Sequence, residues 1–553
     1  MDLDTDDLDT DDLDTDLDTD LDTDLDMDLD MDTAQPATVA IYRGFSDLPA
    51  EMIDMIIDYS DTPELQNDEL GKKRLAWAFT WTRINSHTRD VAIAHRSMWS
   101  TVYLHHSLPL IDMFLTRSQY KTFHNLVAFL HTSICSKNNK KHKLKRWTQF
   151  FKEDLDKIVS LKIQIDSPWE HHPMAIALRR TPAPLLHTFG LTLDHASTMQ
   201  FDFTSLFNSQ APLLQSALIH TNQAYDTSIL PSLDDFSLRL GPSNFNVLFD
   251  NLAANPFLQS ISLSGKNSWP QSVLPPSPDH SLSLPELKVL SVKQITSERV
   301  QHIISNLELP SLDTLIVQEI MAPDPEDPET PMLTVSDALP SISHLAGDWL
   351  SLSFSSRAFS LEMGGYSYVT RWTTDDIPMT SIVDSICHVF QLLDQQHTLV
   401  PKATRLTIVN SITRHNEDAN PSPSDDCQAE PLPAKKPRRP VLGPHMDVKD
   451  LEYLVASAFN AFSSVETLEV CGFTIPVIDV LRGAHSEDTS EDSDNPSDEL
   501  FLPHLQHLEL KCTVGWDEEP KYDYDSLIDL LNSENREGLQ ISVPQTTSDQ
   551  PSC

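Results

Sequence analysis

The residues best suited to chemistry are the basic side chains of the stretch KNNKKHKLKR, at residues 137–146. It holds seven lysine, arginine and histidine residues, and Trp147, Phe150 and Phe151 follow it. Cations neutralise phosphates and aromatic rings stack on bases, so this composition is typical of nucleic-acid binding. The formal net charge of −44, however, opposes the approach of a polyanion over long range. We therefore do not expect nucleic acid to be the partner of this protein.

No other group of residues has the spacing of a catalytic or metal site. His171 and His172 are adjacent, which is not the spacing of two ligands on one helix face. The aspartate repeats near the start of the chain contain DxDxD but lack the glycine and the final glutamate of a calcium-binding loop. The patterns GxxxxGK, GxGxxG, GxSxG and HExxH are absent. We expect no enzymatic activity, no catalytic residue, no metal and no cofactor.

Composition gives the expected compartment. The six cysteines are scattered without a CxxC pair, which predicts reduced thiols. The chain has no N-x-S/T site without an intervening proline, and no apolar run approaches the ~18 to 20 residues of a membrane span. These features predict a protein of the cytoplasm, the nucleus or both, with no membrane partner.

A repeated phrase, P-x-L-x-x-L-x-L, indicates the elements that must position any binding site. Other apolar residues can replace the leucines, and clear copies are PELKVLSV, PSLDTLIV and PHLQHLEL. Alternate side chains of a strand point to one face, so Leu290 and Val292 are expected to enter a core. Two copies without the proline lie around Leu161 and Leu468. The phrase begins at nine prolines: Pro184, Pro212, Pro231, Pro256, Pro285, Pro310, Pro340, Pro401 and Pro503.

The spacing of these prolines resembles a known repeat. The first six are separated by 28, 19, 25, 29 and 25 residues, close to the ~20 to 29 residues of one leucine-rich repeat. Such repeats stack so that parallel strands line one side of a curved solenoid. The asparagine or cysteine of the standard repeat turn is missing. The sequence therefore predicts an α/β fold with an irregular, leucine-rich-repeat-like solenoid over residues 158–545.

Low-complexity segments flank and interrupt the repeats. Residues 1–32 carry 17 aspartates and no basic residue, and like-charge repulsion predicts that residues 1–40 form a disordered acidic tail. Acidic or proline-rich composition predicts insertions at 322–331, 414–445 and 485–499. Within the second, Lys435 to Arg439 form a basic run that fits either a nuclear import signal or a solvated charge cluster.

A small helical module is predicted before the repeats, at residues 41–105. Pro49 suits the first turn of a helix, and Met52, Ile53, Ile56 and Ile57 recur with helical spacing. Two more short helices are expected, from residue 75 to 79 and from 84 to 93, with Trp99 closing the cluster. The segment 106–157, which contains the basic stretch, is expected to link the module to the repeats and to be partly helical.

The helical module resembles the F-box family, whose pattern opens with L-P-x-E-[LM]-[IL]. The segment FLTRS at 114–118 is similar to the one that follows the box in large F-box families of mushroom-forming fungi. The chain departs from the pattern at Asn85, where cysteine is usual, at Thr88, where tryptophan is usual, and in a longer insertion at 60–74. The residues that match the opening and closing parts are Leu48, Pro49, Glu51, Met52, Ile84, Arg89, Val91, Ala92, Met98 and Trp99.

The resemblance implies a specific role. F-box proteins dock onto a Skp-family adaptor within a cullin-RING ubiquitin ligase, and their repeats hold a protein substrate, so no residue of this chain would be catalytic. The alternative is a scaffold protein without ligase function, for which the basic run would fit a nuclear location. The resemblance does not specify the substrate, which would face strand positions such as Ser291, Lys293, Gln318, Glu469 and Glu509. The residues implied in adaptor binding or its support are Leu48, Pro49, Glu51, Met52, Ile53, Ile56 and Trp99.

Overall fold

The protein forms two compact units in a computed structural model. The first unit comprises Met1–Asp68 and Lys72–His95, and the second comprises Glu69–Gly71 and Arg96–Cys553. The predicted tail at 1–40, the insertions at 414–445 and 485–499 and most of that at 322–331 lie outside the described residues. The structure describes residues 48–62, 65, 68, 70–119, 126–132, 140–165, 171–193, 206–221, 233–241, 245–265, 274, 281–323, 331–332, 348–372, 377–395, 403–410, 446–472, 475–481, 502–511 and 539–542.

The first unit has helices where the apolar spacing predicts them. They are α2 (Ala50–Ser60), α4 (Lys72–Arg83) and α5 (Ser86–Ala94). Their shared core contains Ile53 and Ile57 of α2, Trp81 of α4 and Val91 of α5, all of which are buried. Asn85 is the N-cap of α5, where its side chain accepts a hydrogen bond from the Thr88 backbone N–H. An asparagine at this position, where the F-box pattern has cysteine, is therefore explained locally by its role as a helix cap.

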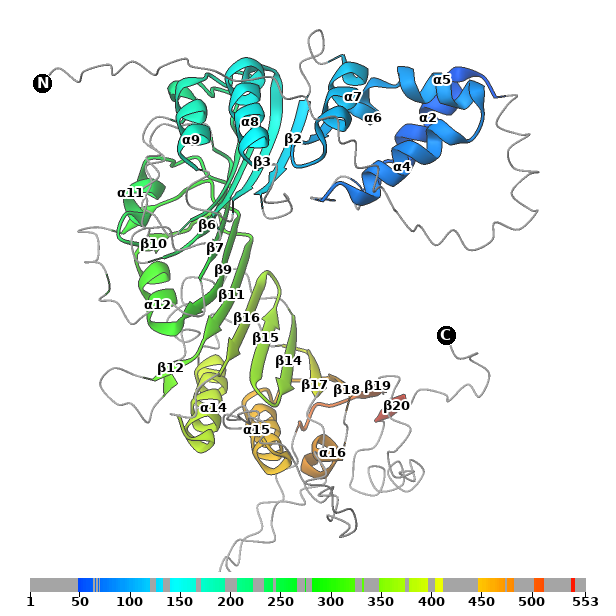
Figure 1. Ribbon diagram of the computed structural model, residues 1–553. Helices are drawn as coiled ribbons and strands as arrows, with labels where there is room; N and C mark the ends of the chain where they lie inside the picture. Colours follow the sequence, from blue (N-terminus) through cyan, green and yellow to red (C-terminus); the bar gives the residue numbers. More distant parts are fainter. Residues whose placement is uncertain are drawn as a thin grey trace, which may run out of the picture. The chain divides into compact units, whose positions relative to one another are not determined.

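The second unit is built on one 16-stranded, mostly parallel sheet (Figure 1). This is an α/β architecture consistent with a leucine-rich-repeat-like fold. In sheet order the strands are β1 (Thr101–Tyr103), β2 (Leu126–His131), β3 (Ile158–Ile165), β4 (Thr188–Leu193), β5 (Ser216–His220), β6 (Asp235–Arg239), β7 (Ser260–Ser264), β9 (Val289–Thr296), β11 (Thr314–Ile320), β16 (Tyr366–Arg371), β15 (Ala358–Met363), β14 (Trp349–Ser355), β17 (Arg405–Asn410), β18 (Thr467–Gly472), β19 (His507–Lys511) and β20 (Gln540–Ser542).

The repeated phrase locates most parallel strands. Copies that begin at eight of the nine prolines lead into β4, β5, β6, β7, β9, β11, β17 and β19, and the two copies without proline form β3 and β18. The copy at Pro340 lies outside the described residues. Leu290 pairs in register with Ile261 and Leu315 of the flanking strands, and all three side chains are buried. The prediction that alternate apolar residues enter a common core is confirmed for these strands.

Three parts of the sheet carry no such phrase, and one of them is the last strand, β20. Strands β1 and β2 extend the parallel sheet before residue 158. The segment 106–157, expected to be a partly helical link, contributes β2 to the sheet and forms helices at Leu108–Ser118 and Lys140–Asp154. Strands β14, β15 and β16 form an antiparallel meander inserted between β11 and β17. Their alternating apolar and polar residues are typical of antiparallel strands, and Gly364, with a φ of 55°, lies in the turn from β15 to β16.

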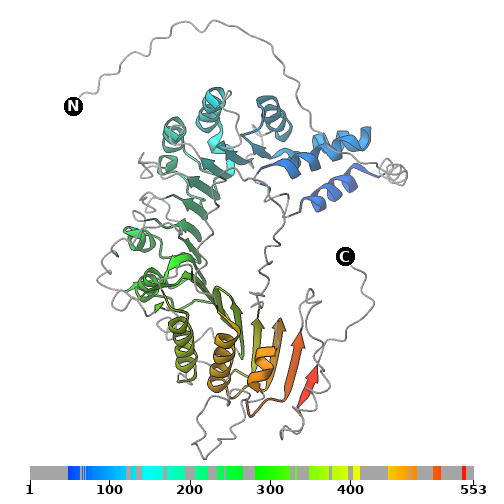
Figure 2. The same ribbon diagram turned by 60° about the horizontal axis from the view of Figure 1, so that its bottom comes forward.

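Helices cover one face of the sheet, and within the described part of the chain no helix covers the other face (Figures 1 and 2). Buried strand residues such as Leu161 and Ile163 point to the helices, and their neighbours point to what we call the open face, formed by alternate strand residues from Tyr103 in β1 to Glu509 in β19. Two other helices, α6 (Arg96–Trp99) and α7 (Leu108–Ser118), flank β1. The covering helices are α8 (Lys140–Asp154), α9 (His171–Arg180), α11 (Leu248–Ala253), α12 (Ser297–Ser305), α14 (Met379–Gln395), α15 (Val448–Ala461) and α16 (Ile475–Leu481).

Candidate functional site

Helix α2 of the first unit presents an apolar surface to solvent. Met52, Met55 and Tyr59 are 44%, 64% and 92% exposed. Their spacing of three and four residues places them on one side of the helix. We call these three residues the α2 surface. Only nine large apolar side chains are exposed among the described residues, so the presence of three on one short helix indicates an interaction surface rather than random scatter.

Contacts on its other side hold α2 in place. The Arg74 guanidinium donates to both carboxylate oxygens of Asp61, at 2.9 and 3.3 Å. The Trp77 indole N–H donates to the Ser60 hydroxyl at 2.9 Å, so the end of α2 is tied to α4. At its beginning, the His87 ring nitrogen Nε2 lies 3.0 Å from the Leu48 carbonyl oxygen. The α2 surface therefore stands on a helix that is anchored at both ends.

The predicted adaptor-binding residues of the first unit differ in their exposure to solvent. Pro49, Glu51 and Met52 are exposed, and Leu48 and Ile56 are half-buried. Ile53 is fully buried in the core of the first unit. Met55 and Tyr59 were not among the residues suggested by the F-box pattern, although their spacing from Met52 already indicates a second apolar side of the same helix.

Trp99 has a different environment from the rest of the predicted set. It lies in the second unit and is fully buried. Its ring packs edge-on against Phe114 of α7, with centroids 5.0 Å apart, and the Arg117 guanidinium lies 4.4 Å from the ring centroid. Trp99 therefore stabilises the start of the second unit and has no surface to offer a partner.

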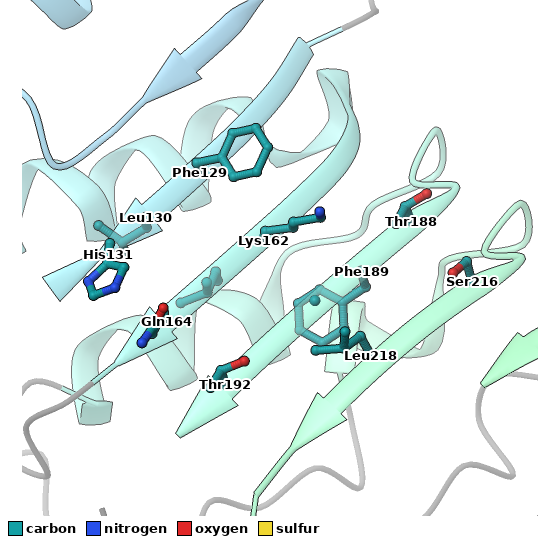
Figure 3. A pocket seen from close by; sticks show the side chains of 12 residues that line it. Phe129, Leu130, His131, Lys162, Gln164, Thr188, Phe189, Thr192, Ser216 and Leu218 are labelled. Atoms are coloured by element: carbon teal, nitrogen blue, oxygen red, sulfur yellow. The ribbon is translucent and has the colours of Figure 1, made fainter. Parts of the chain in front are cut away.

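A pocket of about 260 Å³ lies on strands β2 to β5 (Figure 3). Phe129, Lys162, Gly190 and Leu218 form one row across these strands, because each pairs in register with the next. Gly190 leaves the middle of the row empty, and a Cβ atom there would lie 3.2 Å from Lys162 Cγ. We call this hollow the Gly190 pocket. It exists because a glycine stands where an open-face side chain would otherwise fill the row.

The chemistry of the Gly190 pocket is cationic, aromatic and hydroxyl-rich. Lys162 Nζ lies 5.6 Å from the centroid of the Phe129 ring, and the hydroxyls of Thr188, Thr192 and Ser216 surround the hollow (Figure 3). None of its twelve lining residues is acidic. A lysine and several hydroxyl donors suit an anionic group, and the aromatic wall suits an aliphatic stem.

The open face changes its charge character along the sheet. From β2 to β9 its strands carry the cations Lys162, Arg239 and Lys293, and Asp235 is the only acidic residue in those strands. Toward the other end, Glu469 accepts hydrogen bonds from Arg405 at 2.9 Å and Lys511 at 2.8 Å. The bond from Lys511 is the main reason that the pKa of Glu469 is lowered. In strands β17 to β19, the charges of Arg405, Glu469 and Lys511 are therefore already paired with one another.

The strand positions predicted to face a substrate all lie on the open face, and they differ in accessibility. Lys293, Gln318 and Glu509 are half-buried. Ser291 is buried, and Glu469 is held in the ion pairs with Arg405 and Lys511. Lys293 is therefore the accessible cation of this predicted set.

The basic stretch does not combine with its aromatic neighbours into a binding surface. Trp147, Phe150 and Phe151 of α8 are buried, and the Trp147 indole N–H donates to the Leu104 carbonyl oxygen at 2.6 Å. Lys143 donates to the His105 carbonyl oxygen, and Arg146 pairs with Asp112, each at 3.0 Å. The aromatic rings that would stack on bases are thus part of the core of the second unit.

Comparison with known proteins adds no relative: the chain matches no protein-family model and no curated protein. Within the described residues, no helix is long and apolar enough to cross a membrane. The same part of the chain has no group of three or more histidine, cysteine, aspartate or glutamate side chains placed to hold a metal ion.

Proposed function

We propose that this protein is a substrate-recognition subunit of a Skp-cullin-F-box ubiquitin ligase. The helical module binds a Skp-family adaptor, and the open face of the sheet binds a protein substrate. The observation that supports this most is the α2 surface, which follows directly on the Leu48-Pro49 pair of the F-box resemblance. The proposal assigns no catalytic residue, because the chemistry belongs to other subunits, and it implies a cytoplasmic or nuclear site of action.

The separation of the two units supports such a division of labour. The residues that resemble the F-box opening lie in the first unit, and the long open face lies wholly in the second. An apolar helix surface suits a stable protein partner. A long sheet face edged by hydroxyl and charged side chains suits an extended polypeptide.

The test is co-purification of the full-length chain with a Skp-family adaptor and its cullin. The wild type is expected to enter the complex. The double variant Leu48→Ala/Pro49→Ala is expected to be lost from it, because both changes alter the entry to α2. A chain that folds, shows no adaptor binding and still binds other proteins through its sheet would instead be the scaffold protein of the alternative interpretation.

A further inference from the structure

The Gly190 pocket lies at one end of the cationic part of the open face. Although the whole chain is strongly acidic, the strands from β2 to β9 carry three lysine or arginine side chains against the single carboxylate of Asp235. Positive formal charges on a sheet face attract negatively charged segments. The occupant of this region is therefore expected to be acidic.

The dimensions fit an extended peptide. Lys162 in β3 and Lys293 in β9 are separated by five strand steps in the sheet order. Neighbouring strands lie ~4.8 Å apart, so these lysines are roughly 24 Å apart, the reach of about seven extended residues. A peptide that crosses the strands can thus place one carboxylate in the Gly190 pocket and another near Lys293.

The lining of the pocket favours a carboxylate side chain. Lys162 supplies the charge, and Thr188, Thr192 and Ser216 supply hydroxyl donors around it. Phe129 and Leu218 supply apolar walls for the methylene groups that carry the carboxylate. Hydrogen bonds to a charged group are stronger than neutral ones, so Lys162 is expected to dominate the affinity.

We propose that the Gly190 pocket binds a carboxylate of an acidic, extended segment of a partner protein. This inference rests on the proposed function only for the identity of the partner, which would be the substrate of the ligase. The pocket selects for acidic segments, and the hollow above Gly190 limits the size of the group that enters.

The direct test measures binding of a short labelled peptide of alternating glutamate and serine to the full-length protein by fluorescence anisotropy at ~0.15 M salt, which screens the net negative charge of the chain beyond ~8 Å. The glutamate peptide is expected to bind, and the same peptide with glutamine in place of glutamate is expected to bind at least about tenfold more weakly. Lys162→Gln should weaken binding of the glutamate peptide about tenfold or more. Lys152→Gln is the matched control, since Lys152 is exposed on α8, and it should leave binding unchanged.

A second variant tests the hollow itself. Gly190→Val adds a β-branched side chain that suits a strand and occupies the middle of the pocket, beside Lys162 Cγ, so it should weaken binding strongly without removing any charge. Equal binding by the wild type, Lys162→Gln and Gly190→Val would overturn the proposal. So would binding of a phosphoserine and glutamine peptide in preference to the glutamate peptide.

Two further measurements separate this proposal from its alternatives. Deleting residues 2–32 tests whether the chain's own aspartates are the occupant: binding of the peptide only after this deletion would overturn the assignment to a partner protein. Adaptor co-purification of Lys162→Gln and Gly190→Val should equal that of the wild type. Peptide binding without adaptor binding would leave the pocket intact and refute the proposed ligase role.

Discussion

Replacing Leu290 by alanine tests whether its side of the sheet is the buried face that packs against the helices. Leu290 lies in β9, is 0% exposed and is flanked in register by the buried residues Ile261 and Leu315. Truncation removes roughly three methylene equivalents at ~0.8 kcal/mol each and leaves a cavity that the neighbouring strands cannot close. We expect the free energy of unfolding to fall by about 2.7 to 5 kcal/mol.

Leu218→Ala is the matched control. The same atoms are removed from a strand of the same sheet, but Leu218 is half-buried on the open face. Its truncation creates no enclosed cavity, so we expect a loss of about 1 kcal/mol. Urea unfolding of both full-length variants, followed by circular dichroism, gives the two differences from the shift in midpoint. Equal losses, or a larger loss for Leu218→Ala, would refute the assignment of the two faces.

Two further predictions concern a titratable group and a helix cap. Burial, more than the nearby charges of His106, His131 and Lys143, lowers the pKa of His105 from 6.5 to about 4. His105 therefore binds a proton more readily in the unfolded chain than in the folded one. Its contribution to the free energy of unfolding is complete above pH 6.5 and is lost as the pH falls toward 4, by about 3 kcal/mol at most. The free energy of unfolding of His105→Gln, measured across this range, should depend less on pH than that of the wild type, and an identical pH dependence would contradict the reasoning. Asn85→Ala removes the N-cap of α5 and should destabilise the first unit by about 1 kcal/mol, which lowers its melting temperature. Asn85→Asp keeps a capping oxygen and should largely retain the melting temperature of the wild type. An unchanged melting temperature in the alanine variant would show that the cap is dispensable.

The parallel strands could be predicted because each carries its own local signal. The proline and the apolar residues that follow it mark strands such as β9 and β11 without knowledge of their neighbours. The antiparallel meander has a different signal, simple alternation, and its place between β11 and β17 depends on pairing that no local pattern contains. Strands β1 and β2 were missed because they lack the proline phrase.

The candidate site shows the same division between local and nonlocal information. Met55 and Tyr59 could have been found from their spacing on one helix. The Gly190 pocket could not, because Lys162, Gly190 and Leu218 lie a full repeat apart and meet only through the strand register. A glycine within a strand becomes a hollow only when the side chains on both flanking strands are known.

The most direct test of the central claim is a calorimetric titration of a purified Skp-family adaptor into the full-length protein. The change to the protein is Met55→Lys/Tyr59→Lys, which places two charges on the α2 surface while leaving its buried side intact. The control is Ala76→Lys, at an exposed position of α4. We predict that the wild type and Ala76→Lys bind the adaptor with similar affinity and that the double variant does not bind. Absence of binding by the wild type, or unchanged binding by the double variant, would contradict the assignment of α2 as the adaptor-binding helix.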